Sequence, residues 1–338
     1  MQQVVMSSLQ HRCRGRWVMS LASVALSMLM SGMHNMVQAQ AFPQRSVRMI
    51  VPFAPGGPGD VIGRTLSDRL APLWGQPVVV DNKPGAGGNL GSDLTAKAPA
   101  DGYTILLAAN SHVTNGALYD KLPYDPIRDF TPISMVAYYA LVLVTNLDLP
   151  VRNLRELVDY ARAHPGKLSF GSAGTGTPTH LAAELFRGVA GIDLVHVPYK
   201  GAAPATADLL GGSLQGMFNN PVSALPQVKA GKVRAIATTG LQRSLTSPEV
   251  PTVAESGYPG FEAGTWFAML GPAGIPREIV GRLSADLGRV LNLPEVRQRM
   301  AAQGVEAVPG TPDQLGATMR ADLEKWTRVI RAGNIRPD

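Results

Sequence analysis

The chain has 338 residues, 45% of them hydrophobic, which is enough for a buried core, and a formal net charge of +6. Part of that charge lies near the N-terminus: without Arg12, Arg14 and Arg16, the 31 lysines and arginines fall to 28, against 25 aspartates and glutamates. This small excess is spread along the chain and gives no reason to expect nucleic-acid binding. The one cysteine, Cys13, precedes the main body, so disulfides, thiolate nucleophiles and cysteine metal ligands are excluded there.

The N-terminal segment has the layout of a secretory signal peptide. The three arginines precede an apolar, methionine-rich run from Trp17 to about Met33, and small residues follow at Ala39 and Ala41. Serines dilute the run, and it is shorter than the roughly 20 residues that a membrane span needs, which disfavours a permanent anchor. We therefore expect residues 1–39 to be a Sec-type signal peptide, cleaved after Ala39 or Ala41, and the mature protein to be periplasmic.

Strand-like runs alternate with amphipathic helical stretches along the rest of the chain. Several runs are continuously apolar or β-branched, as in a sheet covered on both faces, and the alternation predicts mainly parallel sheets with right-handed crossovers. From Arg277 to Ile330 the pattern is largely helical. The expected strands are Val47–Phe53, Pro77–Asp81, Tyr103–Ala108, Ile133–Val144, Lys167–Phe170, Asp193–Pro198, Leu214–Asn219, Val233–Thr238 and Thr265–Leu270.

Two segments share the order strand, glycine-rich turn, helix. They are Met49–Asp60 and Leu168–Pro178, and in the second Thr177 and Pro178 have the residue types of a helix N-cap and a first helical position. Such a turn leaves backbone N–H groups unpaired at a helix N-terminus, where an anion is favoured. Either turn alone is better explained as a tight connection. Two in one chain indicate two anion-binding loops that face each other across a cleft.

Other site chemistry finds little support in the sequence. Neither turn has the Gly-Lys-Ser/Thr ending of a phosphate loop or a G-x-G-x-x-G pattern, and Gly171–Gly174 does not satisfy the G-x-S-x-G pattern of a nucleophile turn. The histidines form neither an H-x-x-x-H pair nor an H-E-x-x-H motif, so no metal site is expected. We interpret His180 as a neutral capping or packing residue and Asp60 as a structural cap. No cofactor and no catalysis are expected.

Aromatic and polar residues follow several of the expected strands. Phe53 ends the first strand, Tyr199 and Lys200 follow another, and Asn219 ends a third. In open α/β sheets the ligand crevice lies outside the carboxyl ends of the strands, so these side chains are candidates for ligand contacts. The Tyr199 hydroxyl is a candidate donor, whereas Lys200 is better explained as a solvated surface charge.

Six short motifs occur in order along the chain: Val51–Gly57, Pro77–Asn89, Asp101–Thr104, Ser172–Gly176, His196–Gly201 and Val250–Thr252. Together they closely resemble the tripartite tricarboxylate transporter substrate-binding proteins, or Bug family, over nearly all of the chain after the N-terminal segment. The resemblance implies an α/β, type II periplasmic-binding-protein fold, with two Rossmann-like lobes joined by two crossing strands and a ligand cleft between them. On that basis lobe 1 is expected at 42–143 plus 262–338, and lobe 2 at 144–261.

The resemblance also implies a carboxylate held largely by backbone groups and waters. The implied ligand-binding residues are Phe53, Pro55, Gly56, Gly57, Pro58, Gly59, Asp60, Ser111 and His112 in lobe 1, and Ser172, Ala173, Gly174, Thr175, Gly176, Thr177, Tyr199, Lys200, Gly201, Ala202 and Asn219 in lobe 2. The chain departs from the family's usual pattern twice. Pro58-Gly59 replace Gly-Thr, and Asn219-Asn220 replace Asp-Asn, which removes an acidic group and argues against a cationic ligand.

The expected function is therefore that of a solute-binding protein, which closes like a flytrap on a small carboxylate and delivers it to the permease subunits of a tripartite tricarboxylate-type transporter. The alternative is an adaptor that presents the closed state to a sensor kinase. An enzyme on this scaffold would need a nucleophile–base pair or a metal constellation, and the sequence shows neither. A monomer is expected. Crowding the loop backbone, by Gly57→Val or Gly174→Val, is expected to abolish binding while folding stays largely intact.

Overall fold

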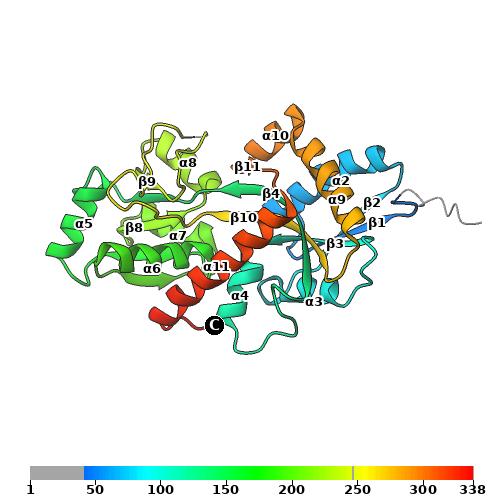
Figure 1. The fold of residues 1–338 in the computed structure, drawn as a ribbon. Coiled ribbons are helices and arrows are strands. Elements are labelled where there is room, and N and C mark those ends of the chain that lie inside the picture. The colour runs from blue at the N-terminus through cyan, green and yellow to red at the C-terminus, as the bar shows by residue number, and fades with distance from the viewer. Residues whose placement is uncertain (1–41, 246, 338) are drawn as a thin grey trace, which may run out of the picture. The chain divides into compact units, whose positions relative to one another are not determined.

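Two β-sheets form the framework of the chain (Figure 1). The structure, a computed structural model, describes residues 42–245 and 247–337. The expected signal peptide and its cleavage sites fall outside these residues. Within the described ranges, no helix has both the length and the apolar character needed to cross a membrane.

The first sheet has six strands in the order β11-β4-β10-β3-β1-β2. Its central strand β10 is buried along its whole length, which explains why its sequence is a continuous apolar run. β1 pairs in parallel with β2 and β3, whereas β10 is antiparallel to β3 and β4, and β11 is antiparallel to β4. The strands are β1 (Val47–Val51), β2 (Val78–Asn82), β3 (Thr104–Ala109), β4 (Phe130–Tyr139), β10 (Thr265–Pro272) and β11 (Glu306–Ala307).

The second sheet has five strands in the order β7-β6-β8-β5-β9. β6 is parallel to β7 and β8, and β5 is antiparallel to β8 and β9. The strands are β5 (Val142–Thr145), β6 (Ser169–Ser172), β7 (Val195–Pro198), β8 (Gly216–Asn219) and β9 (Arg234–Thr238). The α/β fold class expected from the sequence is thus confirmed.

The chain passes between the sheets twice, from β4 to β5 and from β9 to β10. The prediction of one strand at Ile133–Val144 was wrong, because β4 ends at Tyr139 in the first sheet and β5 starts at Val142 in the second. The prediction of mainly parallel sheets was also wrong. Every antiparallel pair among the described strands includes β4, β5 or β10, so the antiparallel pairing comes from the segments that cross between sheets. The exact lobe boundaries stay a prediction.

Helices cover both sheets, and the last one spans both cores. Helix α11 (Pro312–Ala332) begins with a capping box and runs diagonally across the middle of the molecule (Figure 1). Near its start, Leu315 and Met319 are buried in the core of the first sheet, whereas Trp326 and Ile330 are buried in the core of the second. The other helices are α2 (Pro58–Trp74), α3 (Asn89–Ala96), α4 (Ser111–Leu118), α5 (Leu154–Ala163), α6 (Pro178–Ala190), α7 (Ala202–Leu210), α8 (Pro221–Lys229), α9 (Arg277–Leu291), α10 (Pro294–Ala301) and the 3-10 turn η2 (Ala86–Gly88).

Candidate ligand cavity

Three helices begin at one cavity. The loop after β1 leads into α2 at Pro58, the residue after β3 leads into α4 at Ser111, and the loop after β6 leads into α6 at Pro178. All three helix starts line a cavity of about 600 Å³, which is within the usual size of small-molecule sites. Its wall consists of Phe53, Ala54, Pro55, Gly57, Pro58, Gly59, Ala109, Asn110, Ser111, Tyr139, Pro178, Thr265 and Phe267.

The cavity favours an anion although no charged side chain lines it. Lysine, arginine, histidine, aspartate and glutamate are all absent from the described residues of its wall. At the N-cap positions of the three helices, Gly57, Asn110 and Thr177, no side chain accepts a hydrogen bond from a first-turn backbone N–H. The helix ends therefore present positive partial charge to the cavity, and each would stabilise an anionic group there by about 0.3–1 kcal/mol.

The rest of the wall is mostly apolar and includes three aromatic rings. Phe53 and Phe267 pack edge to face, with ring centroids 6.0 Å apart and an interplanar angle of 81°. The ring of Tyr139 lies 6.5 Å from that of Phe267 at 38°. The cavity thus combines a positive rim of helix ends with an apolar interior, which suits a ligand that has an anionic group and an apolar body.

Asp60 stabilises the first loop from inside the protein and does not line the cavity. Its Oδ2 accepts hydrogen bonds from the Gly56 N–H at 2.9 Å and Arg64 Nε at 3.0 Å, and its Oδ1 accepts one from Asn82 Nδ2 at 3.0 Å. The hydrogen bond from Arg64 is the largest cause that lowers the pKa of Asp60, to about 2. The structural role predicted for Asp60 is confirmed. Because both carboxylate oxygens are occupied, its assignment as a ligand contact has no support in this geometry.

His112 is a second residue that was expected at the ligand and lies elsewhere. Its ring is buried between Tyr124 and Phe130, with centroid distances of 5.5 and 4.4 Å. Nε2 lies 3.0 Å from the carbonyl oxygen of Pro126, and Nδ1 lies 3.0 Å from the Ser92 hydroxyl. Burial lowers the pKa of His112 to about 4, so the ring is neutral at pH 7. His112 therefore orders the core behind α4, while its neighbour Ser111 reaches the cavity.

Most N–H groups of the second glycine-rich loop already donate hydrogen bonds within the protein. The N–H groups of Ala173 and Gly174 donate to Thr179 Oγ1 at 2.9 Å and Ser172 Oγ at 3.2 Å. The Gly176 N–H donates to His180 Nδ1 at 3.0 Å. The sequence prediction of free N–H groups is therefore wrong at these three positions. Within residues 172–178, Pro178 is the residue that lines the cavity.

Two histidine rings stack behind this loop. His180 lies on His196 with a centroid distance of 3.6 Å, and burial lowers the pKa of His180 to about 3. Since His180 is neutral, accepts the Gly176 N–H and packs on a ring, its predicted role is confirmed. Nε2 of His196 lies 2.7 Å from Ser172 Oγ, so this pair holds the end of β6 against β7.

The other lobe 2 candidates are also absent from the cavity wall. Tyr199 donates its hydroxyl to Asp208 Oδ2 at 2.6 Å, which raises its pKa to about 12, so this hydroxyl is not free to bind a ligand as expected. Asn219 is buried, with Nδ2 donating to Thr206 Oγ1 at 3.0 Å and Oδ1 accepting the Asn220 N–H at 2.9 Å. The remaining expected residues outside the wall are Gly56, Thr175, Thr177, Lys200, Gly201 and Ala202.

Sequence reasoning missed the residues that form the back of the cavity. Tyr139 and Thr265 face each other in register on β4 and β10, and Phe267 follows on β10. No local pattern marks these residues, because they meet only when the chain returns through the second crossing. Asn219 was selected because it lies at the carboxyl end of a strand. The same rule would have selected Asn110, which directly follows β3.

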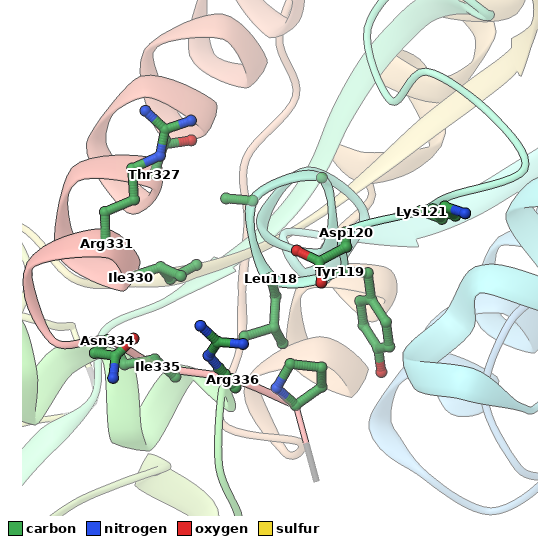
Figure 2. A pocket seen from close by; sticks show the side chains of 13 residues that line it. Leu118, Tyr119, Asp120, Lys121, Thr327, Ile330, Arg331, Asn334, Ile335 and Arg336 are labelled. Atoms are coloured by element: carbon green, nitrogen blue, oxygen red, sulfur yellow. The ribbon is translucent and has the colours of Figure 1, made fainter.

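A larger hollow of about 760 Å³ lies away from these helix starts, between the end of α4 and the C-terminal part of α11. Figure 2 shows Asp120 and Lys121 on one side and Arg331 and Arg336 on the other. These four side chains are exposed, and no buried unpaired polar atom of the described residues lies in this wall. The smaller cavity is therefore the better candidate for a ligand.

Comparisons with known proteins agree with this architecture. The family model described as "Tripartite tricarboxylate transporter family receptor" matches residues 62–335. A UPF0065 protein from the tcbD-tcbE intergenic region of Pseudomonas sp. strain P51 is 41% identical over 311 residues, covering 92% of each chain.

Two solved structures share the fold over most of the chain. R. palustris Rpa4515 with adipate is 34% identical, with a TM-score of 0.73, and the match covers 88% of this chain and all of that one. The periplasmic binding protein BugD is 36% identical, with a TM-score of 0.70 and the same coverage of both chains. The chain therefore belongs to the tripartite tricarboxylate transporter receptor family, also called the Bug family, and has its two-lobed α/β fold.

Proposed function

We propose that this protein is a periplasmic solute-binding protein that captures a small carboxylate in the cavity at the three helix starts. The observation that carries the proposal is the convergence of α2, α4 and α6 on a wall without charged side chains. A carboxylate needs several N–H donors, and the starts of α2 and α4 would supply them without an arginine clamp. Pro178 at the start of α6 has no N–H, so this helix adds its dipole alone. The adipate in the Rpa4515 structure, at 34% identity, supports a carboxylate as the ligand class.

Closure of the two lobes would follow from how the cavity is built. Most of its wall belongs to the first sheet and its helices, whereas Pro178 belongs to α6 beside the second sheet. A ligand that contacts both sides gains its full set of contacts only when they approach, so binding favours the closed state. The two crossings, β4 to β5 and β9 to β10, are the natural hinge. We propose that the closed form delivers the ligand to membrane permease subunits; recognition by a sensor kinase is the competing role.

One contact bears on the enzyme alternative. Ser172 Oγ and His196 Nε2 lie 2.7 Å apart, as in a nucleophile–base pair, which the sequence alone did not reveal. However, Ser172 is fully buried, and neither residue lines the cavity. A bound carboxylate would have no access to this hydroxyl. We therefore assign the pair a structural role and propose binding without catalysis.

Thermal unfolding in the presence of candidate ligands tests the proposal. The protein is expressed as the full chain, purified, and unfolded and refolded to remove co-purified ligand. Adipate, malate, citrate, benzoate and hydroxybenzoates are then compared with their amides at the same concentration. At 100 times the Kd, a ligand of the native state adds about 2.7 kcal/mol to the free energy of unfolding. We expect a shift with at least one carboxylate and none with its amide. Carboxylate capture would be excluded if only amides raised the thermal stability, or if no compound raised it.

A further inference from the structure

Gly59 determines where the ring of Phe53 lies. A Cβ built on Gly59 would lie 2.5 Å from Cδ2 of Phe53 and 3.1 Å from Cε2, closer than real Cβ contacts. Any side chain at position 59 would therefore displace the ring. The resemblance to the family leads one to expect threonine at position 59. Because Gly59 has no side chain, the Phe53 ring can pack on the first turn of α2, so Gly59 and Phe53 act as a pair.

The placed ring completes an aromatic wall. Phe53 packs edge to face on Phe267 at 6.0 Å, and Tyr139 lies next to Phe267 at 6.5 Å. All three residues line the same cavity, Phe267 from the central strand β10 and Tyr139 from β4. Aromatic rings prefer edge-to-face and offset contacts, each worth about 0.5–1.5 kcal/mol beyond the buried area. A flat ring inside this wall would gain such contacts, whereas a flexible aliphatic chain would gain only burial.

Two buried polar atoms without a hydrogen-bond partner among the described residues belong to residues that line this apolar interior, Asn110 Oδ1 and Thr265 Oγ1. The Thr265 hydroxyl can donate or accept, whereas Asn110 Oδ1 can only accept. Asn110 is 2% exposed. A buried unpaired acceptor costs about 1–3 kcal/mol, which a ligand donor would recover. A carboxylate cannot donate a hydrogen bond, so a different group of the ligand must do so. A hydroxyl group meets this requirement.

We propose that the cavity selects an aromatic carboxylate with a hydroxyl substituent, a hydroxybenzoate-like acid. The inference rests on the proposed function and deepens it. The carboxylate lies at the helix starts, where it accepts N–H bonds. The ring packs within the wall of Phe53, Phe267 and Tyr139. The hydroxyl donates to Asn110 Oδ1, which makes Asn110 and the pair Phe53–Gly59 determinants of specificity.

Isothermal titration of the refolded full chain tests the class of ligand. The probes are 2-, 3- and 4-hydroxybenzoate, benzoate, adipate and malate. We expect one hydroxybenzoate isomer to bind at least about 10-fold more tightly than benzoate and than either aliphatic acid. If adipate or malate binds more tightly than every aromatic acid, this inference is wrong while carboxylate capture stands. If none of the six binds and no other carboxylate raises the thermal stability, the proposed function itself fails.

Two variants separate the parts of the inference. Asn110→Ala removes the acceptor of the hydroxyl group and should reduce the preference for the hydroxybenzoate over benzoate to less than about 3-fold. Gly59→Ala should displace Phe53 and weaken the aromatic acids at least about 10-fold more than adipate. Gly281→Ala on α9 is the matched control, because its Cβ would meet nothing within 4 Å. Thermal unfolding confirms that each variant is folded. An unchanged preference in Asn110→Ala, or an equal loss for all acids in Gly59→Ala, would overturn the assignment.

Discussion

Substitution of Gly57 is the most direct test of the cavity. Gly57 is the N-cap of α2, lines the cavity, and has φ −79° and ψ 170°, which any residue adopts. A Cβ there would meet only the carbonyl oxygen of Ala54, at 3.6 Å, an ordinary contact. Gly57→Val should therefore fold normally, with a change of less than about 1 kcal/mol in the free energy of unfolding.

The valine methyl groups would nevertheless occupy space beside the first-turn N–H groups of α2. A carboxylate held there would lose contact with this helix end, which contributes about 0.3–1 kcal/mol, and would lose packing as well. We expect affinity to fall about 10- to 100-fold, equivalent to about 1.4–2.8 kcal/mol. Gly57→Ala, which adds only the tolerated Cβ, should lose less than Gly57→Val.

Gly174 behaves differently, which corrects the expectation that both valine variants would fold equally well. Its φ is +132°, where residues with side chains are rarely found, and a Cβ would lie 3.3 Å from the carbonyl oxygen of Tyr199. Gly174→Val should cost about 1–3 kcal/mol in stability. Thermal unfolding and titration with a carboxylate shown to bind the wild type measure both effects. Normal unfolding of Gly57→Val together with unchanged affinity would refute the placement of the ligand at this loop.

Three further predictions concern stability. Trp326→Ala should lower the free energy of unfolding in urea by about 3–5 kcal/mol, because the 2% exposed ring is packed in the core of the second sheet. The exposed control Leu73→Ala should change this free energy by less than about 0.5 kcal/mol. Similar values for both variants would contradict this packing. Gly216→Ala should cost about 1–3 kcal/mol, since its Cβ would lie 2.7 Å from the ring of Phe170, and a neutral result would mean that the ring moves freely. Because the pKa of Asp60 is depressed to about 2 from 3.8, its contribution is complete above about pH 4 and is lost as the pH falls towards 2. In Asp60→Asn, the loss in free energy of unfolding between about pH 4 and pH 2 should therefore be about 1 kcal/mol smaller than in the wild type. The value is modest because Arg64 is half exposed. A pH dependence identical to that of the wild type would argue against this ion pair.

The sequence was most informative where local pattern decides the structure. The helix stripe of Leu154, Leu157, Val158 and Ala161 is buried as its spacing predicts. Likewise, Thr177 and Pro178 are the N-cap and first residue of α6. In contrast, the apolar run Ile133–Val144 contains no signal for the break after Tyr139, because both halves are strand-forming and only the partner strands distinguish them.

The candidate site shows the same limit. The glycine-rich loop from Phe53 to Gly59 was identified from its sequence, and all of its residues except Gly56 line the cavity. For the second loop, composition predicted free N–H groups, but Ser172, Thr179 and His180 accept three of them. The sequence does not show whether a side chain of the neighbouring turn accepts hydrogen bonds from the N–H groups of the loop. The same holds for Asn110, whose unpaired oxygen becomes visible only when its surroundings are known.

Helix α4 connects the cavity to the second glycine-rich loop. It begins at Ser111 in the cavity wall and ends at Leu118, whose side chain belongs to the core of the second sheet. Leu118 lies against Gly176, where a Cβ would come within 2.6 Å of Cδ2. Trp326 and Ile330 of α11 join the same core. A hinge motion at the two crossings must therefore either keep these contacts or rearrange them. Because packed contacts have few alternative arrangements, the closure proposed above would be a switch between two states and not continuous bending. A carboxylate at the start of α4 and α6 would favour the state in which Leu118 and Gly176 stay together, which links ligand binding to the position of the second lobe.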